Sequence, residues 1–307
     1  MSKSLKADLM LMLVTLCWGV SYILMNVCLG EIGPLTLNAY RFLIAFFAAL
    51  ILAFPKLKNV NKATLRYSAM IGLALALVYI SVTYGVMYTS LSNAGFLCAL
   101  TVIITPVLTF YIKKEAPNKK LIAVLIMCLI GIGLMTLNEQ LKPALGDVLC
   151  ILCAFIYAVD LMLVDKAVHK EEVNAFQLGV YQLGFTGLYM FVLSIVLETP
   201  VLPSKPSIWA AMLFLAIFCT GVAFIVQVIA QQYTSATHVG VIFALEPVFA
   251  AIAAFFFAGE RLLPRAYIGA LLMLAGIIIL EVDFKSIVNK KIASNDLRID
   301  NSDNFKD

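Results

Sequence analysis

Long apolar runs, separated by short polar breaks, recur along nearly the whole chain of 307 residues. A helix that crosses a bilayer needs about 20 consecutive apolar residues. Glycine and proline mark many of the breaks, for example at Gly33-Pro34 and Pro264, as expected where helices end. The pattern predicts an all-α polytopic membrane protein with ten transmembrane helices, at 7–29, 35–54, 67–88, 91–112, 121–137, 146–165, 175–197, 208–230, 236–258 and 264–283.

Composition supports this interpretation, because 63% of the residues are hydrophobic and 13% are charged. Soluble domains contain roughly 45–50% apolar and about 25% charged residues. The basic residues lie in the short breaks between apolar runs, which argues against nucleic acid as a partner. We therefore expect the lipid bilayer to surround most of the chain.

Lysine and arginine are distributed unequally between alternate breaks, and cytoplasmic loops are normally enriched in them. With the N-terminus inside, 17 of the 22 basic residues lie in cytoplasmic segments and 4 in outside loops, while Arg41 lies within a span. Both termini are thus expected in the cytoplasm, in a multi-pass protein of the cell membrane. Residues 285–307 are polar and are expected to form a disordered cytoplasmic tail.

The two halves of the chain resemble each other. A shift of 139 residues places DLMLMLVTLCWGV, from position 8, on DVLCILCAFIYAV, from position 147. A shift of 145 residues places YTSLSNAGFLCAL, from position 88, on YTSATHVGVIFAL, from position 233. These offsets predict two five-helix repeats, 1–143 and 144–284. Because five is odd, the second repeat would be inverted in the membrane, and inverted repeats of secondary transporters place the substrate site near the midplane between them.

Polar atoms interrupt the first predicted span in the stretch WGVSYILMN, residues 18–26. Trp18, Tyr22 and Asn26 are spaced by four residues, so they share one side of a helix. Trp18 lies near the middle of the span, whereas tryptophans that anchor helices belong at the membrane interfaces. The shift of 139 places Tyr157 at the equivalent point of the second repeat. We expect these four side chains to line a polar cavity, with ordinary packing between helices as the alternative.

Three ionisable side chains, Arg41, Asp160 and Glu246, fall deep within predicted spans. A charge at the bilayer centre costs about 2.5–3.5 kcal/mol on insertion scales, so such residues face a partner or a cavity. One interpretation is an internal ion-pair network, including an Arg41–Glu246 bridge. The other is a site in which Arg41 binds substrate and Glu246 or Asp160 couples transport to protons. Further cavity candidates are Tyr79, Tyr84, Gln182 and Gln227.

Motifs for catalysis are missing from the sequence. It contains no GxxxxGK[ST] of an ATP motor, no HExxH and no GxSxG, and it has only 2 histidines. Cys150 and Cys153 form a CxxC within an apolar span, but no second pair completes a zinc site, so we expect them to pack as small apolar residues. The sequence predicts a non-enzymatic protein without a metal or other cofactor.

Over about residues 5–284, the sequence resembles the EamA-type, ten-helix branch of the drug/metabolite transporter superfamily. The likeness rests on CWGVSY in the first span and on Arg41-Phe42 in the second. It also rests on the closing segments of the two repeats, each of which has a charged loop with Glu followed by a final helix that contains Gly. It implies a secondary carrier of a small-molecule substrate: an exporter of amino acids or related compounds, with protons as the coupling partner. Multidrug or amine efflux, metabolite import, and a channel or membrane scaffold are the alternatives. The loop KKEAPNKK departs from the Gly-Glu-Arg at 259–261, so no shared role is carried over to these loops.

Overall fold

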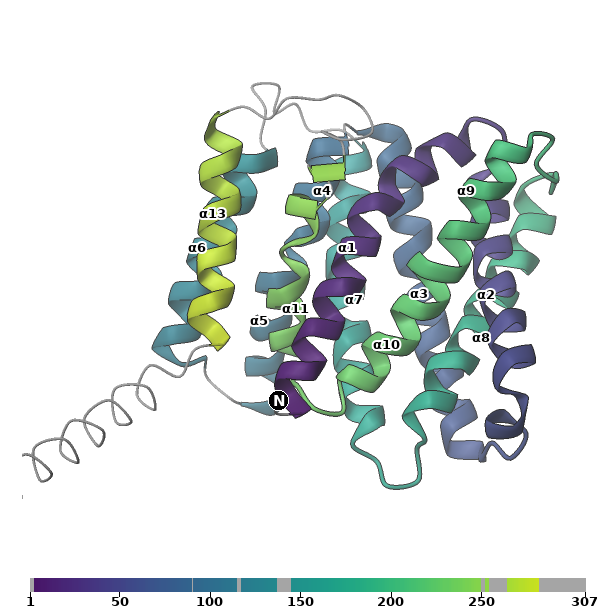
Figure 1. Cartoon of the computed structure of the whole chain (residues 1–307), viewed down its shortest axis with the longest axis horizontal. Coiled ribbons are helices and arrows are strands. Elements are labelled where there is room, and N and C mark those ends of the chain that lie inside the picture. Colours follow the sequence, from purple (N-terminus) through teal and green to yellow (C-terminus); the bar gives the residue numbers. More distant parts are fainter. Residues whose placement is uncertain are drawn as a thin grey trace, which may run out of the picture.

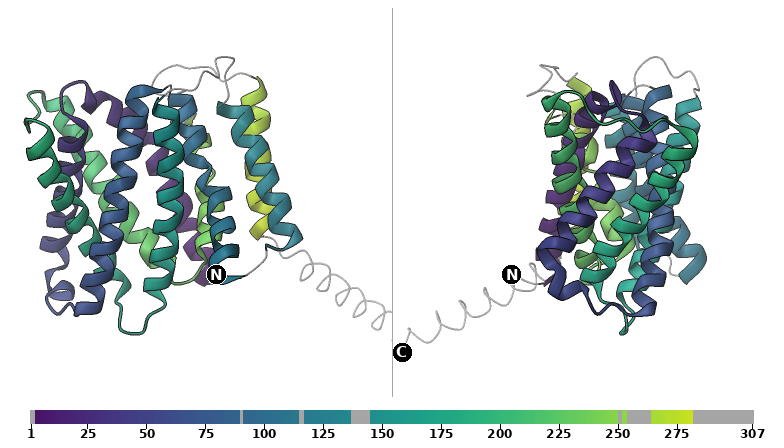
Figure 2. Two further views of the ribbon diagram at one scale, coloured as in Figure 1. Left: turned by 180° about the vertical axis from the view of Figure 1, so that it is seen from behind. Right: turned by 90° about the vertical axis from the view of Figure 1, so that its right-hand side faces the viewer.

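The computed structural model describes residues 3–89, 91–114, 117–136, 145–249, 252–253 and 264–281. They form helices that run roughly side by side (Figure 1, Figure 2). In chain order these are α1 (Lys3–Leu29), α2 (Pro34–Leu57), α3 (Lys62–Tyr88), α4 (Leu91–Ala99), α5 (Thr101–Lys113), α6 (Lys119–Thr136), α7 (Leu145–Val168), α8 (Ala175–Leu197), α9 (Pro206–Ala216), η1 (Ile217–Val222), α10 (Ala223–Ala230), α11 (Ala236–Phe243) and α13 (Pro264–Glu281). The predicted tail at 285–307 and the loop at 259–261 lie outside the described residues.

The helical, membrane-spanning class predicted from the apolar runs is confirmed. Within the described residues, six helices are long and apolar enough to cross a membrane: Leu5–Leu29, Pro34–Leu57, Lys62–Tyr88, Leu145–Val168, Ala175–Leu197 and Pro206–Ala230. Shorter apolar helices lie at Leu97–Ile112, Ala236–Phe249 and Tyr267–Gly276. The predicted break between the third and fourth spans is also present, because α3 ends at Tyr88 and Thr89 is extended, with φ −142° and ψ 174°.

Three of the predicted spans are interrupted. The span 91–112 breaks at Leu100, between α4 and α5. The span 208–230 contains the π-helical turn η1. In the span 236–258, α11 ends at Phe243, and a turn follows.

Local hydrogen bonding accounts for the interruptions. Pro247 has no N–H with which to continue the helical pattern to the Phe243 carbonyl, so α11 ends there. At the first break, the Thr101 hydroxyl donates to the Cys98 carbonyl at 2.8 Å. In η1, the Thr220 hydroxyl donates to a carbonyl five residues earlier, at 2.8 Å. Apolar periodicity does not report such breaks, because the residues on both sides of them remain apolar.

The pair formed by α6 and α13 lies at one end of the molecule (Figure 1). Gly131 lies where these two helices touch: a Cβ atom there would be 2.5 Å from Cγ of Met273 and 2.7 Å from the Gly269 carbonyl oxygen. Small residues permit this close approach of two backbones in a membrane. The larger core lies in the rest of the bundle, where α3 packs along both α7 and α8.

Candidate functional site

A cavity lies inside the bundle, among α1, α2, α3, α4, α5, α7, α10 and α11. Its volume is about 80 Å³, measured as the space open to the centres of water-sized molecules, which is several times the roughly 10–15 Å³ that one water needs. It is lined by Trp18, Ser21, Tyr22, Met25, Arg41, Val78, Tyr79, Val82, Cys98, Ala99, Thr101, Cys153, Tyr157, Phe224, Gly240, Phe243, Ala244 and Glu246.

Aromatic side chains form one wall of this cavity. The Trp18 ring centroid lies 4.8 Å from that of Phe243, 5.3 Å from that of Phe224 and 6.0 Å from that of Tyr157. The Phe224 ring lies 6.0 Å from the ring of Tyr79. These separations fall in the favourable range of roughly 4.5–7 Å for aromatic pairs. The wall is therefore a preformed apolar surface against which the body of a small molecule can pack.

Trp18 contributes its ring to this wall, but its polar atom has another role. The indole Nε1 donates a hydrogen bond to the Cys219 carbonyl in η1, at 2.9 Å. The N–H that the sequence interpretation assigned to a polar cavity thus joins α1 to η1. Trp18 offers apolar and π surface to the cavity rather than a free donor.

Arg41 reaches the cavity from α2 and is 1% exposed. Its Nε donates to the Thr220 hydroxyl at 2.8 Å, and its guanidinium carbon lies 4.8 Å from the centroid of the Tyr79 ring. Its Nη2 atom is buried and has no hydrogen-bond partner within the described residues. The guanidinium is thus fixed on one edge and one face while keeping donor capacity for another group.

Glu246 follows the break in the ninth predicted span and lines the same cavity. Its carboxyl group lies close to the Tyr22 hydroxyl. Among the described residues, Glu246 forms no ion pair with Arg41, so the bridge considered from the sequence is not present in this conformation. The cavity therefore presents a cation and a carboxyl group that are not neutralised by each other.

Several lining residues are related by the offsets found in the sequence. Trp18 and Tyr157 are separated by 139 residues, and both line the cavity. A separation of 145 relates four further pairs in the lining: Tyr79 with Phe224, Cys98 with Phe243, Ala99 with Ala244, and Thr101 with Glu246. Equivalent segments of the two halves thus contribute to one cavity.

Two predicted cavity residues lie elsewhere. Asn26 is exposed and does not line the cavity, because each step of four residues advances a helix by about 40° beyond a full turn, so that Asn26 is turned by about 80° from Trp18. Tyr84 also lies outside the lining, and its side chain lies close to Glu198.

Asp160 and Gln182 are buried outside the lining, each 1% exposed. In the described part of the chain, neither carboxylate oxygen of Asp160 and neither amide atom of Gln182 has a hydrogen-bond partner. Substrate in the cavity would therefore not touch either residue in this conformation.

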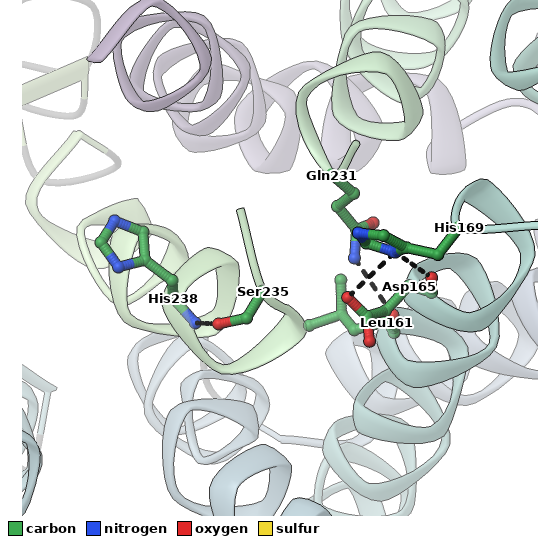
Figure 3. A network of polar contacts seen from close by, with 6 residues as sticks. All are labelled: Leu161, Asp165, His169, Gln231, Ser235 and His238. Atoms are coloured by element: carbon green, nitrogen blue, oxygen red, sulfur yellow. Dashed lines mark hydrogen bonds and ion pairs between the residues drawn. The ribbon is translucent and has the colours of Figure 1, made fainter. Parts of the chain in front are cut away.

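Gln227 lies just outside the cavity in a line of hydrogen bonds between α7 and α10. It accepts a hydrogen bond from the Tyr157 hydroxyl at 3.2 Å and donates one to Gln231 at 3.3 Å. Gln231 in turn donates to the Leu161 carbonyl at 3.1 Å, as Figure 3 shows. The line fixes the hydroxyl of Tyr157, and with it the position of the ring in the cavity wall.

The two histidines lie near helix ends (Figure 3), and neither is among the residues that line the cavity. Nδ1 of His169 is 2.7 Å from the carbonyl oxygen of Asp165. The backbone N–H of His238 donates to the hydroxyl of Ser235, the N-cap of α11, at 3.3 Å. Nε2 of His238 lies 3.3 Å from a carboxylate oxygen of Asp8, which links the beginning of α1 to the beginning of α11.

The sequence interpretation missed Phe224, Phe243 and Thr220. Their hydropathy does not separate phenylalanines that face a cavity from those that face lipid. The offset of 145 carried a signal for Phe224, because it relates that residue to the candidate Tyr79. No sequence signal identified Thr220, since its contact with Arg41 depends on the π-helical turn.

No metal centre is apparent in the described residues, where no group of three or more His, Cys, Asp or Glu side chains is placed to hold an ion. The seven cysteines are free thiols. Cys153 lines the cavity beside Cys98, and Cys150 is fully buried. Cys150 therefore packs between α7 and α3, whereas Cys153 contributes to the cavity lining.

Comparisons with known proteins agree with this architecture. The sequence model of the EamA-like transporter family matches twice, at residues 5–137 and 144–282. Two proteins of Archaeoglobus fulgidus, each named an uncharacterized transporter, are similar to nearly the whole chain. One is 28% identical over 283 residues, covering 91% of this chain and 87% of the relative. The other is 30% identical over 280 residues, covering 89% and 96%.

A solved crystal structure of a protein 18% identical in sequence superposes with a TM-score of 0.75, over 90% of this chain and 96% of that one. At this level of identity, the superposition supports the fold alone. The family match is independent of it and extends over both halves of the sequence. The helical bundle, the cavity and this match lead to one conclusion: the chain belongs to the EamA-like transporter family.

Proposed function

We propose that this protein is a secondary active transporter that exports amino acids or related small zwitterions across the cytoplasmic membrane. The observation that carries the proposal is the cavity, in which Arg41 and Glu246 are held apart beside an aromatic wall. Unpaired charges of opposite sign are costly in a low-dielectric interior. A zwitterion offers a carboxylate to Arg41 and an ammonium group to Glu246, while its apolar body packs on the aromatic rings.

The proposed architecture is ten membrane-spanning helices in two inverted repeats, with both termini in the cytoplasm. It is supported by the excess of basic residues in alternate loops and by the double match of the family model. It is also supported by the equivalent residues from both halves that line the cavity. In such folds the two halves rock around a central site, so that the site opens to each side in turn.

Glu246 is our candidate for proton coupling, and Asp160 is the second. Glu246 lines the cavity beside Tyr22, where its carboxyl group is in a position to contact substrate. Asp160 is buried apart from the cavity. A carboxyl group that binds either a proton or the ammonium group of a substrate, but not both together, links the two fluxes.

Reconstituted proteoliposomes test this function. A panel of radiolabelled amino acids, nucleosides and amines is offered under a pH gradient, and accumulation above equilibrium is measured. We expect amino acids to accumulate. Accumulation of amines without amino acids would favour amine efflux, and flux that never exceeds equilibrium would indicate a channel; either result overturns the proposal.

The Glu246→Gln variant tests the coupling. It retains the shape of the side chain but cannot release a proton. We expect exchange of labelled for unlabelled substrate to persist, while accumulation driven by the pH gradient is lost. Asp160→Asn is the matched control. If Glu246→Gln still concentrates substrate with the pH gradient as its sole driving force, Glu246 is not the coupling residue.

A further inference from the structure

The π-helical turn η1 holds two cavity residues that come from two other helices. Its Cys219 carbonyl accepts the hydrogen bond of Trp18 from α1. Its Thr220 hydroxyl accepts the hydrogen bond of Arg41 from α2. Turns of this kind occur frequently at functional sites. Here the turn lies directly behind the cavity wall, where it determines how both side chains are oriented.

The hydrogen bonds of Thr220 have a fixed direction. A threonine hydroxyl has one proton, and an arginine Nε–H can only donate. The Thr220 proton is directed to the Leu215 carbonyl at 2.8 Å. A lone pair of the same oxygen therefore remains for Nε of Arg41, at 2.8 Å. This arrangement fixes the rotation of the guanidinium plane.

The orientation leaves Arg41 ready for an anionic group. One face of the guanidinium is covered by the Tyr79 ring, 4.8 Å from its centroid, and Nε is occupied. Nη2 is buried without a partner, and within the described residues no carboxylate pairs with Arg41. A planar guanidinium matches the geometry of a carboxylate, which it can bind through two parallel hydrogen bonds.

The charges of the lining favour a carboxylate over a phosphate. Among the described residues that line the cavity, Arg41 is the single cationic side chain and Glu246 is the single acidic one. A dianionic phosphate would meet one positive charge and one carboxyl group. A carboxylate that belongs to a zwitterion leaves the occupied cavity close to neutral.

We propose that Thr220 is the positioning residue for the anionic end of the substrate: it orients Arg41 so that the guanidinium binds a substrate carboxylate. This inference rests on the proposed function, which supplies the zwitterionic substrate. Thr220 acts through Arg41 and does not itself touch the substrate. Its effect should therefore be confined to ligands that carry a carboxylate.

Binding to the purified full-length protein in detergent tests the inference. The probes are L-leucine, its decarboxylated analogue 3-methylbutylamine, its deaminated analogue 4-methylpentanoate, and inorganic phosphate. In Thr220→Val, which keeps the shape of the side chain but lacks the hydroxyl, we expect Kd for leucine and 4-methylpentanoate to rise about tenfold, the loss typical of a weakened hydrogen bond to a charged group. Kd for 3-methylbutylamine should not change. Thr220→Ser, which restores the hydroxyl, should bind all probes like the wild type.

The amine separates a positioning role from a general structural role, because a damaged fold would weaken every probe. If Thr220→Val does not fold, Arg41→Lys provides the second test, since it keeps the charge but loses Nε–H and the planar fork; the same selective loss is expected. Suppose that the wild-type protein binds leucine. If Thr220→Val then leaves Kd for leucine unchanged, or raises Kd for the amine as much as Kd for leucine, this inference alone is overturned. Wild-type protein that binds the amine but neither carboxylate overturns the proposed function as well. Displacement of leucine by inorganic phosphate at similar affinity would overturn the assignment of a carboxylate.

Discussion

Gly33 offers a sharp test of how α2, the helix that carries Arg41, is held in place. Glu198, just after α8, accepts hydrogen bonds from the backbone N–H groups of Leu35 and Thr36 at 2.9 and 2.8 Å, and from the Thr36 hydroxyl at 2.7 Å. A Cβ atom on Gly33 would lie 2.5 Å from one carboxylate oxygen of Glu198. Gly33→Ala should therefore displace Glu198 and remove the cap of α2.

The magnitude follows from these contacts. The backbone of Gly33, with φ −63° and ψ 151°, suits alanine, so the substitution introduces no backbone strain. Losing a helix N-cap costs about 0.5–2 kcal/mol, and losing a negative charge near a helix N-terminus adds about 0.3–1 kcal/mol. Since Glu198 is only partly buried, we expect Gly33→Ala and Glu198→Ala each to lower the free energy of unfolding by about 1–2 kcal/mol.

The double variant distinguishes this mechanism from others. Without Glu198, alanine at Gly33 meets no carboxylate and restricts the unfolded chain, which is worth about 0.4–1 kcal/mol in favour of folding. Gly33→Ala should thus become neutral or stabilising in the Glu198→Ala background. The assay is equilibrium unfolding in mixed detergent micelles, followed by the fluorescence of Trp18 and Trp209. Losses that simply add in the double variant would refute the reasoning.

Three further outcomes are expected. Trp18→Phe keeps a ring in the cavity wall but removes the donor to the buried Cys219 carbonyl, so it should lower the free energy of unfolding by about 1–3 kcal/mol. Thermal unfolding checks this, and unchanged stability together with a large loss of substrate affinity would contradict it. Asp160→Asn should retain accumulation driven by a pH gradient, and its loss in flux assays would contradict the choice of coupling residue. A reporter active only in the cytoplasm should signal when fused after Lys120 and stay silent after Lys142; signals from both fusions would contradict the ten-span topology.

The helical class and most helix boundaries could be predicted from the sequence, because an apolar run long enough to cross a bilayer has few other stable forms. The span 175–197 matches α8, and the first span begins only four residues after α1 does. Pro247 in the sequence also indicated the interruption at Phe243. The interruptions at Leu100 and η1 could not be predicted in the same way, because they depend on hydrogen bonds of individual side chains, which leave hydropathy unchanged.

Part of the cavity was also accessible from the sequence. Trp18 and Tyr157 were found because polar-tipped aromatics at mid-membrane depth recur at a constant offset, and both line the cavity. Asn26 was misplaced because a spacing of four drifts around the helix. Arg41 and Glu246 were identified because ionisable residues are rare deep within predicted spans. The sequence could not decide whether they pair, since that depends on distances between helices far apart in the sequence.

The π-helical turn has a consequence for how this chain tolerates changes in length. Such a turn holds one residue more than the α-helix around it, so removing one residue from 217–222 would restore a regular helix. Because the turn absorbs its extra residue locally, the helix beyond it would keep nearly its present direction. The residues within the turn would change places instead, so the Cys219 carbonyl and the Thr220 hydroxyl could not both remain where Trp18 and Arg41 meet them. We expect a single-residue deletion here to disturb those two side chains more than the fold, so that the length of this segment is a character to follow when the chain is aligned with its relatives.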